Sequence, residues 1–193
     1  RPENEKAKGV FMKKFNAILA LLTILSLLGH TAVMTYSLMT GWYNFVICHA
    51  LGGAALLLLT LHAALSIIIV FFCHEGSALT RHWKLNIRTI LQRGTGLLLI
   101  LVLHMHMNVY GFIAAGQALT AGDRACKILL ELLFAASLMV HVGTSFSKAL
   151  ITLGWLASED AARRIDRVTT VVVVCMGIVY AFAIVRFFMG WMA

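Results

Sequence analysis

Histidine side chains deep inside long apolar stretches are the residues of this sequence most able to do chemistry. Four of them fall in four separate stretches, namely His30, His62, His106 and His141. An ionisable side chain at such depth in a membrane span is costly unless something binds it, so it marks a functional site. Imidazole is a common ligand of haem iron and of other transition metals. Four histidines on four helices therefore predict ligands for a group that is held between those helices.

The stretches that carry these histidines have the length and composition of transmembrane helices. Of the 193 residues, 61% are hydrophobic and 12% are charged. A helix needs about 20 apolar residues to cross a bilayer, and Leu- and Ala-rich runs without strict alternation favour helices over a β-barrel. We expect an all-α membrane protein, a single domain over residues 1–193, whose first four spans form a bundle around the bound group. The five predicted spans are 15–39, 44–72, 90–115, 126–153 and 168–190.

The basic residues are distributed unevenly between the two ends of these spans. If the spans alternate in direction, all 16 Lys and Arg residues except Arg124, Lys127 and Arg186 lie on one side. The positive-inside rule then predicts a cytoplasmic N-terminus and an outside C-terminus in the inner (cytoplasmic) membrane. Residues 1–14 are expected as a polar tail at the membrane surface. The net charge of +8 is explained by topology and gives no support for nucleic-acid binding.

Chain direction and depth divide the four histidines into two pairs. The first and third spans run in the same direction and carry His30 and His106 about 24 Å from their cytoplasmic ends, at about 1.5 Å per residue. By the same rise, His62 and His141 lie about 16–20 Å from the cytoplasmic ends of their spans. The result is an outer pair and an inner pair, each from two non-adjacent helices. Such pairs could hold two bis-histidine haems stacked across a bilayer.

A weak internal repeat accompanies this pairing. His30 lies 14 residues after Asn16, and His106 lies 14 residues after Gln92. The outer histidines are 76 residues apart and the inner ones 79, which indicates a duplicated helix pair, with chance similarity between apolar helices as the alternative. Because His104 and His106 lie about 200° apart around a helix, only one of them can face the bundle interior. The repeat favours His106.

Two segments carry a resemblance to a known family. The run Gln92-Arg93-Gly94-Thr95-Gly96 precedes His106, and HVGTSFSKALITLGWL (141–156) continues from a histidine through small residues and a lysine to a Gly-Trp exit. In addition, HAAL (62–65) and LGH (28–30) are similar to haem-binding helices of the same family. In this order and spacing, the chain resembles the cytochrome b membrane anchor of succinate:quinone and quinol:fumarate oxidoreductases, in its five-helix, two-haem form. The resemblance extends over nearly the whole chain.

The resemblance implies cofactors, a substrate and partners. It implies two haem b groups, with His30 and His106 on the outer iron and His62 and His141 on the inner one. Quinone or menaquinone is the implied substrate, and quinol:fumarate reductase is favoured over succinate dehydrogenase. The implied partners, besides membrane lipid, are a flavoprotein and an iron–sulfur subunit on the cytoplasmic side, in an assembly that can form a dimer of heterotrimers. They would dock on loops that contain Arg81, Lys84, Arg88, Arg163, Arg164 and Arg167.

Residues around the histidines are expected to complete the cofactor site. Haem propionates are anionic and prefer basic partners, for which Arg93, Lys148 and Arg88 are the candidates. Gly96 and Ser145 are small enough for a flat macrocycle to approach the backbone. The simpler explanations are positive-inside charge for the three bases and plain helix packing for the small residues.

The quinol site is expected near the outer haem. Glu131 is the one acid clearly inside an apolar span, about ten residues before His141. It is the candidate acceptor for protons released by quinol, with His49 at similar depth, and the alternative is an ion pair with Lys127 one turn earlier.

Two other classes of protein remain open. A di-haem cytochrome b of a hydrogenase, of formate dehydrogenase or of a b561-like reductase would keep the haems and change the partner. A haem-free transporter would use the histidines for protons or metal ions, but the sequence has no broken half-helix and few intramembrane acids.

Overall fold

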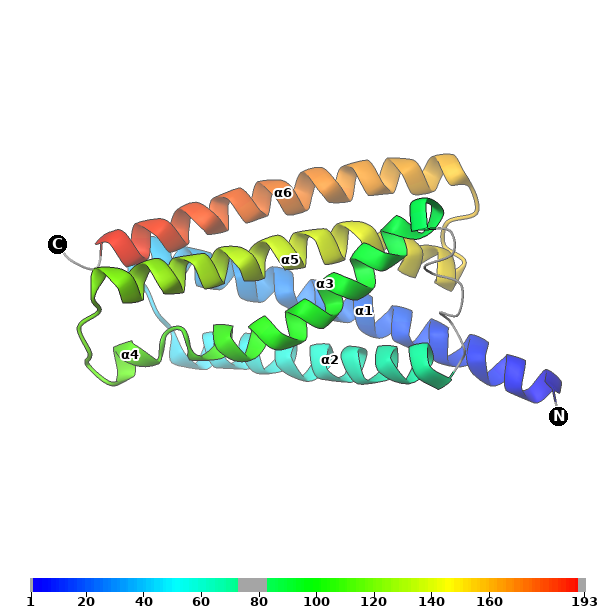
Figure 1. Cartoon of the computed structure of the whole chain (residues 1–193), viewed down its shortest axis with the longest axis horizontal. Helices are drawn as coiled ribbons and strands as arrows, with labels where there is room; N and C mark the ends of the chain where they lie inside the picture. Colours follow the sequence, from blue (N-terminus) through cyan, green and yellow to red (C-terminus); the bar gives the residue numbers. More distant parts are fainter. Residues whose placement is uncertain (1, 73–82, 191–193) are drawn as a thin grey trace.

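The protein is described by a computed structural model over residues 2–72 and 83–190, which form five long helices and one short helix (Figure 1). All five long helices are apolar enough to cross a membrane, and no strand occurs within the described ranges. The predicted class, an all-α membrane protein with five spans, is confirmed. The helices are α1 (Pro2–Thr40), α2 (Phe45–Phe72), α3 (Trp83–Asn108), α4 (Gly111–Ala114), α5 (Ala121–Leu153) and α6 (Glu159–Gly190).

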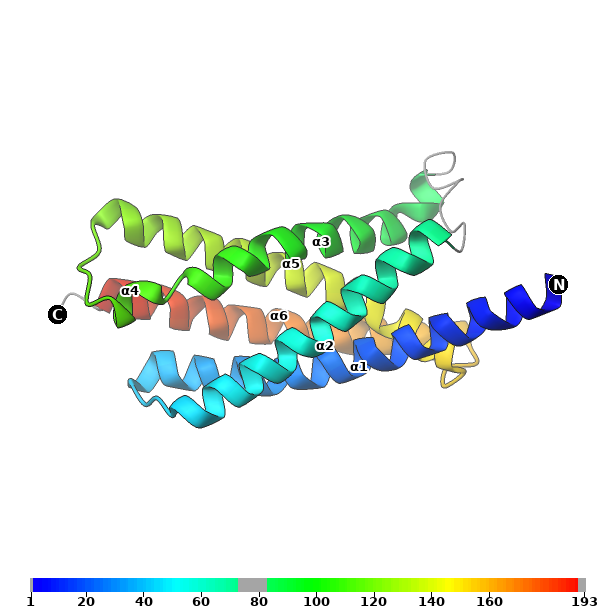
Figure 2. The ribbon, with the colours of Figure 1, turned by 90° about the horizontal axis from the view of Figure 1, so that it is seen from below.

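The long helices form two antiparallel pairs with a fifth helix against them. Helix α1 packs on α2 and α3 packs on α5, while α6 contacts both α5 and α1. Helix α5 also contacts α1, so it packs against α1, α3 and α6 (Figure 2). Helices α1, α3 and α6 begin at one end of the molecule, and helices α2 and α5 end there. We call this end the basic end. The opposite end holds the α1–α2 turn, α4 and the end of α6.

Helix α1 differs from the predicted span at its start. Residues 1–14 were expected as a separate surface tail, but the helix begins at Pro2 and runs without a break to Thr40. Proline suits the first helical turn, and the Glu, Lys, Ala and Met residues that follow are good helix formers. At about 1.5 Å per residue, 39 residues extend about 58 Å, well beyond a hydrocarbon core of about 30 Å. The first turns of α1 accordingly project past the other helices (Figure 1).

Helix α3 ends at Asn108, earlier than the predicted limit of 115. The Asn108 side chain donates to the His104 carbonyl at 2.8 Å, and the Val109 amide bonds back only three residues, to the His106 carbonyl at 3.1 Å. Asparagine side chains that compete for helical carbonyls favour such helix ends. The chain then turns into the short helix α4.

Helices α5 and α6 begin earlier than predicted, because their first turns are polar. Thr120 and Asp123 form a capping box, in which each side chain accepts the other residue's amide at 3.1 and 3.0 Å. Ser158 caps α6 by accepting the Ala161 amide at 3.2 Å. Helix α5 ends at Leu153 and is capped by Gly154, whose φ of 81° lies in the left-handed region that glycine adopts without strain.

Two apolar clusters hold the helices together around the histidines. Leu99, Val102 and Phe134 join α3 to α5 near mid-bundle. A larger cluster lies toward the opposite end and includes residues of α4, α5 and α6, so the helix without a histidine is part of the core. Its buried members are Val109, Phe112, Ala135, Tyr180, Ile184 and Phe188.

Candidate functional site

The histidines of the predicted inner pair face each other across the bundle. The ring of His62 on α2 and the ring of His141 on α5 have centroids 6.5 Å apart and planes inclined at 71°. Metal–imidazole bonds are about 2 Å long, so a metal bound by one nitrogen of each ring places the ring centres roughly 6 Å apart. The observed separation would suit two imidazole ligands of one metal ion.

The hydrogen bond to His141 fixes which of its nitrogens can bind a metal. Its Nδ1 lies 2.9 Å from the backbone carbonyl of Gln92, which only accepts, so Nδ1 carries the proton and Nε2 keeps its lone pair. Metal-binding histidines almost always donate their other N–H to a carbonyl or carboxylate in this way. The Thr95 hydroxyl lies further off, at 3.4 Å from Nδ1.

His106 and not His104 faces the bundle, as the repeat predicts. The His106 side chain is 18% exposed and stacks on Phe134 at 4.4 Å between ring centroids, whereas His104 is exposed. Nδ1 of His106 lies 2.8 and 3.0 Å from the two carboxylate oxygens of Glu131, which again leaves Nε2 of the ring available. His30, the other member of the outer pair, lies within electrostatic range of His106.

Two glycines make room for histidine rings. A Cβ atom on Gly96 of α3 would lie 3.1 Å from Cε1 of His141, and one on Gly52 of α2 would lie 3.3 Å from Cε1 of His30. Gly96 was predicted to admit a macrocycle to the backbone, and the group it admits in the structure is the His141 ring. Gly52 was missed, although the adjacent glycines at 52 and 53 were visible in the sequence.

The two helix pairs share some residue positions around the inner histidines, but their contacts there differ. Ser66 and Ser145 each lie four residues after a histidine of the inner pair. Asn16 donates to Ser66 at 3.0 Å between α1 and α2. The Asn16 backbone also approaches His62 as the Gln92 backbone approaches His141, but only the second contact has the geometry of a hydrogen bond. Accordingly, the buried Nδ1 atoms of His62 and His30 have no hydrogen-bond partner within the described residues.

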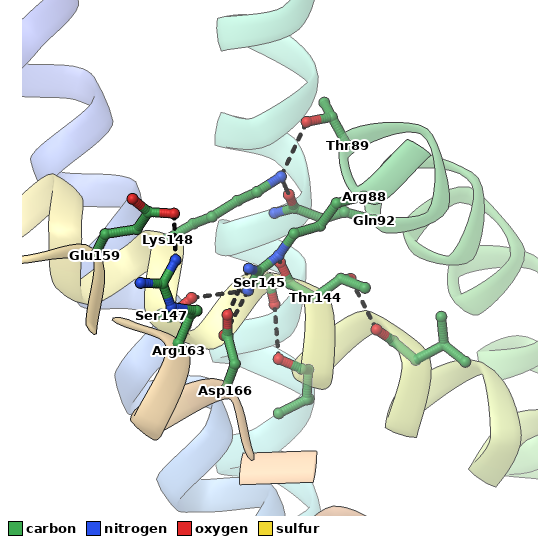
Figure 3. Close-up of polar contacts among 12 residues, drawn as sticks. Arg88, Thr89, Gln92, Thr144, Ser145, Ser147, Lys148, Glu159, Arg163 and Asp166 are labelled. Carbon is green, nitrogen blue, oxygen red and sulfur yellow. Dashed lines mark hydrogen bonds and ion pairs between the residues drawn. The ribbon is translucent and has the colours of Figure 1, made fainter. Parts of the chain in front are cut away.

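Arg88, a predicted propionate partner, is bound by protein groups (Figure 3). Its guanidinium forms two 2.6 Å bonds to the Asp166 carboxylate and further bonds to the Thr144 carbonyl at 3.0 Å and to Ser147 at 2.8 Å. These bonds tie α3 to α5 and α6 at the basic end. Sequence reasoning missed Asp166, whose only signal was an acid among the bases of segment 163–167.

The other two predicted propionate partners, Lys148 and Arg93, form no ion pair with an acidic side chain within the described residues. Lys148 donates to the Thr89 hydroxyl at 3.0 Å and to the Gln92 side chain at 2.9 Å, both of which are neutral (Figure 3). Arg93 makes no hydrogen bond or ion pair to the part of the chain that the structure describes. Ser145 donates to the His141 carbonyl at 2.6 Å within its own helix. Of the three predicted propionate partners, Lys148 and Arg93 are therefore the two that are not paired with an acidic side chain within the described residues.

Glu131 and His49, the predicted proton acceptors, have separate surroundings. The Glu131 side chain is 0% exposed, and besides His106 it accepts the Tyr180 hydroxyl at 2.5 Å. Lys127, its alternative partner, instead donates to the Val109 carbonyl at 2.8 Å. His49 is exposed and its Nδ1 lies 3.0 Å from the Phe45 carbonyl. Whether either residue accepts quinol protons stays a prediction.

A shallow groove of about 330 Å³, largely open to its surroundings, lies between α3 and α5 toward the opposite end of the bundle. Its lining is mostly apolar, with polar groups supplied by His104, Asn108 and Lys127. Leu130, the neighbour of Glu131 in the chain, also lines it.

Over residues 2–72 and 83–190, no group of three or more His, Cys, Asp or Glu side chains is placed to hold a metal ion. Arg81 and the side chain of Lys84, two predicted docking residues, lie outside what the structure describes. No protein-family model, curated protein or solved structure matches this chain.

Proposed function

We propose that this chain is the di-haem cytochrome b membrane anchor of a quinol:fumarate reductase or succinate dehydrogenase. It would pass electrons between quinol, with menaquinol favoured, and cytoplasmic iron–sulfur and flavoprotein subunits. The observation that carries the proposal is the facing pair His62 and His141, 6.5 Å apart, with Nε2 of His141 left free by the bond to Gln92.

The residues of the chain would hold two haems, which supply one-electron redox chemistry when bound. His62 and His141 would hold the inner haem, and His30 and His106 the outer haem. Gln92 and Glu131 would keep the two α3–α5 ligands in the tautomer that iron needs. Arg93 and Lys148 would meet propionates at the basic end, where Arg88 is already bound to Asp166.

The soluble subunits would dock on the basic end. Arg164 and Arg167 are exposed and have no ion pair within the described residues, so they can attract an acidic partner surface. Arg163 is less available, because it pairs with Glu159 and Asp160 in its own helix at 2.6 Å each.

The quinone ring would bind in the groove between α3 and α5. Ligand sites are mostly apolar with a few polar groups, and the lining of this open groove has that composition. His104, Asn108 and Lys127 could donate hydrogen bonds to the quinone oxygens. Placed there, the ring would lie beside the helix turn that holds Glu131, close to the outer haem ligand.

A di-haem cytochrome b of another respiratory complex is the second candidate, because it would need the same histidine pairs. The partner distinguishes the two. Purification of the intact complex from membranes should bring down a flavoprotein with fumarate or succinate activity, whereas a hydrogenase or formate dehydrogenase subunit would favour the second candidate.

A dithionite-reduced minus oxidised spectrum of the purified chain tests the proposal as a whole. We expect the α and Soret bands of low-spin haem b and a pyridine haemochrome count of two haems per chain. A spectrum without haem bands, in protein produced with an adequate haem supply, would favour the haem-free transporter and end the proposal.

A further inference from the structure

Glu131 is a carboxylate enclosed in the membrane-spanning part of the bundle. Its side chain is 0% exposed, and its two hydrogen-bond partners within the described residues are donors, namely His106 Nδ1 at 2.8 and 3.0 Å and the Tyr180 hydroxyl at 2.5 Å. Removing a carboxylate from water is expensive, and hydrogen bonds from two donors are what an ionised carboxylate needs to offset that cost. Such a group is rarely kept inside a membrane bundle without a function.

Three helices contribute to this arrangement, so the carboxylate and the ring hold each other in place. Helix α5 supplies both Glu131 and Phe134, one turn apart, and the Phe134 ring stacks on His106 with an angle of 11° between planes. Helix α6, which has no histidine, supplies Tyr180, itself 8% exposed in the apolar cluster of Ile184 and Phe188. The sixth helix thereby fixes the position of the acid that contacts a predicted iron ligand.

Only one of the four histidines has a carboxylate at its Nδ1. His141 has the neutral Gln92 carbonyl, and the Nδ1 atoms of His30 and His62 have no partner within the described residues. The repeat explains the difference. Glu131 lies ten residues before His141, and the position ten residues before His62 is Gly52, which lies against the His30 ring without a side chain. The two histidines of the outer pair therefore differ in what lies at Nδ1.

We propose that Glu131 is a positioning residue that lowers the reduction potential of the outer haem through His106. This inference rests on the proposed function and adds a role for Glu131 within it. An imidazole that donates to a carboxylate is a more basic, more electron-donating ligand. A negative charge inside a low-dielectric bundle also favours the ferric over the ferrous iron. The inner haem, whose ligand meets only a neutral carbonyl, has no such charge beside it.

The test measures the midpoint potential of each haem separately. In a His62→Ala background only the outer haem should remain, and in a His106→Ala background only the inner haem. Adding Glu131→Gln keeps an acceptor oxygen beside His106 and removes the charge. We expect the ferrous-to-ferric ratio of the outer haem to rise about ten-fold at a fixed potential, which is about 59 mV for one electron. The inner haem should not move by a comparable amount.

Two further variants separate electrostatics from structure. Ser137→Ala removes a buried hydroxyl that bonds within α5 to the Leu133 carbonyl, and it should leave both potentials unchanged. Glu131→Asp keeps the charge and should restore most of the original potential. Low-spin EPR signals should shift for the outer haem alone in Glu131→Gln.

The outcomes are distinct. An outer-haem potential that is unchanged in Glu131→Gln, or an equal shift of both haems, would overturn the inference while leaving two haems in place. Loss of the outer haem alone, or of both haems, in Glu131→Gln would indicate a structural role and would count against the inference. Absence of haem from the unaltered chain would instead refute the proposed function.

Discussion

Replacing Gly96 with leucine should remove the inner haem and spare the outer one. A Cβ atom at this position would lie 3.1 Å from Cε1 and 3.4 Å from Nδ1 of His141, closer than most Cβ contacts. The rest of a leucine side chain would then need the space that the ring occupies. The ring would have to turn away from His62 and from the Gln92 carbonyl.

The size of the effect follows from the overpacking and from the hydrogen bond that is lost. Overpacking a filled site costs about 1–3 kcal/mol, and a displaced Nδ1 also loses a hydrogen bond worth about 1 kcal/mol. Their sum, about 2–4 kcal/mol, corresponds to roughly 30- to 1,000-fold weaker haem binding, since 1.4 kcal/mol is about ten-fold.

Haem counting on purified protein is the assay, and the chain offers matched controls. A Cβ on Gly94, in the same helix, meets nothing within 4 Å, so Gly94→Leu should keep both haems. Helix propensity alone favours leucine over glycine in both positions, so it cannot cause a difference between the two variants. In α2, Gly52→Leu should remove the outer haem, and the adjacent Gly53→Leu, which also meets nothing within 4 Å, should not.

A Gly96→Leu protein with two haems and an unchanged spectrum would refute the reasoning, because the His141 ring could not then be an axial ligand in its present position. Equal haem loss in Gly94→Leu and Gly96→Leu would point to a general packing defect and would refute it as well.

Three further predictions concern docking, stability and quinol chemistry. The double variant Arg164→Glu/Arg167→Glu should release the soluble subunits at lower salt than the unaltered complex does. Arg163→Glu should have a smaller effect, because Arg163 is already paired. Equal retention of the subunits by both variants and by the unaltered chain would place docking elsewhere. Asp166→Asn should destabilise the bundle by about 1–3 kcal/mol and lower its melting midpoint in detergent by a few degrees, since Arg88 loses two charged bonds; the exposed Glu159→Gln should change it little, and the same midpoint in both variants would contradict this. If Glu131 also accepts quinol protons, Glu131→Gln should slow quinol oxidation strongly while viologen-linked fumarate reduction continues, and full quinol activity would exclude that role.

The sequence was sufficient to predict the helices and the residues that face inward. Apolar runs identify the five spans, and the positions of the histidines predict which pairs share a depth, because rise per residue is nearly constant. The limits of the helices were less accurate. The first turns of α5 and α6 are polar, so hydropathy alone places them outside the spans. The Thr120–Asp123 capping pair nevertheless marks the start of α5 in the sequence.

Contacts between distant helices could not be predicted in the same way. The bond from Tyr180 to Glu131 depends on the rotation of α6 about its axis and on its packing against α5, neither of which a single apolar run specifies. The ion pair of Arg88 with Asp166 likewise needs α3 and α6 to approach α5 from two sides. Gly52 was overlooked because a glycine in an apolar helix carries no sign of which ring it faces.

Haem counts on double histidine variants test the central claim most directly. Two variants that remove both ligands of one predicted pair, His62→Ala/His141→Ala and His30→Ala/His106→Ala, should each retain one haem per chain. A variant that removes one ligand from each pair, His30→Ala/His62→Ala, should retain none, and His104→Ala should retain two. One haem in the cross-pair variant, or none in a same-pair variant, would contradict the proposed pairing.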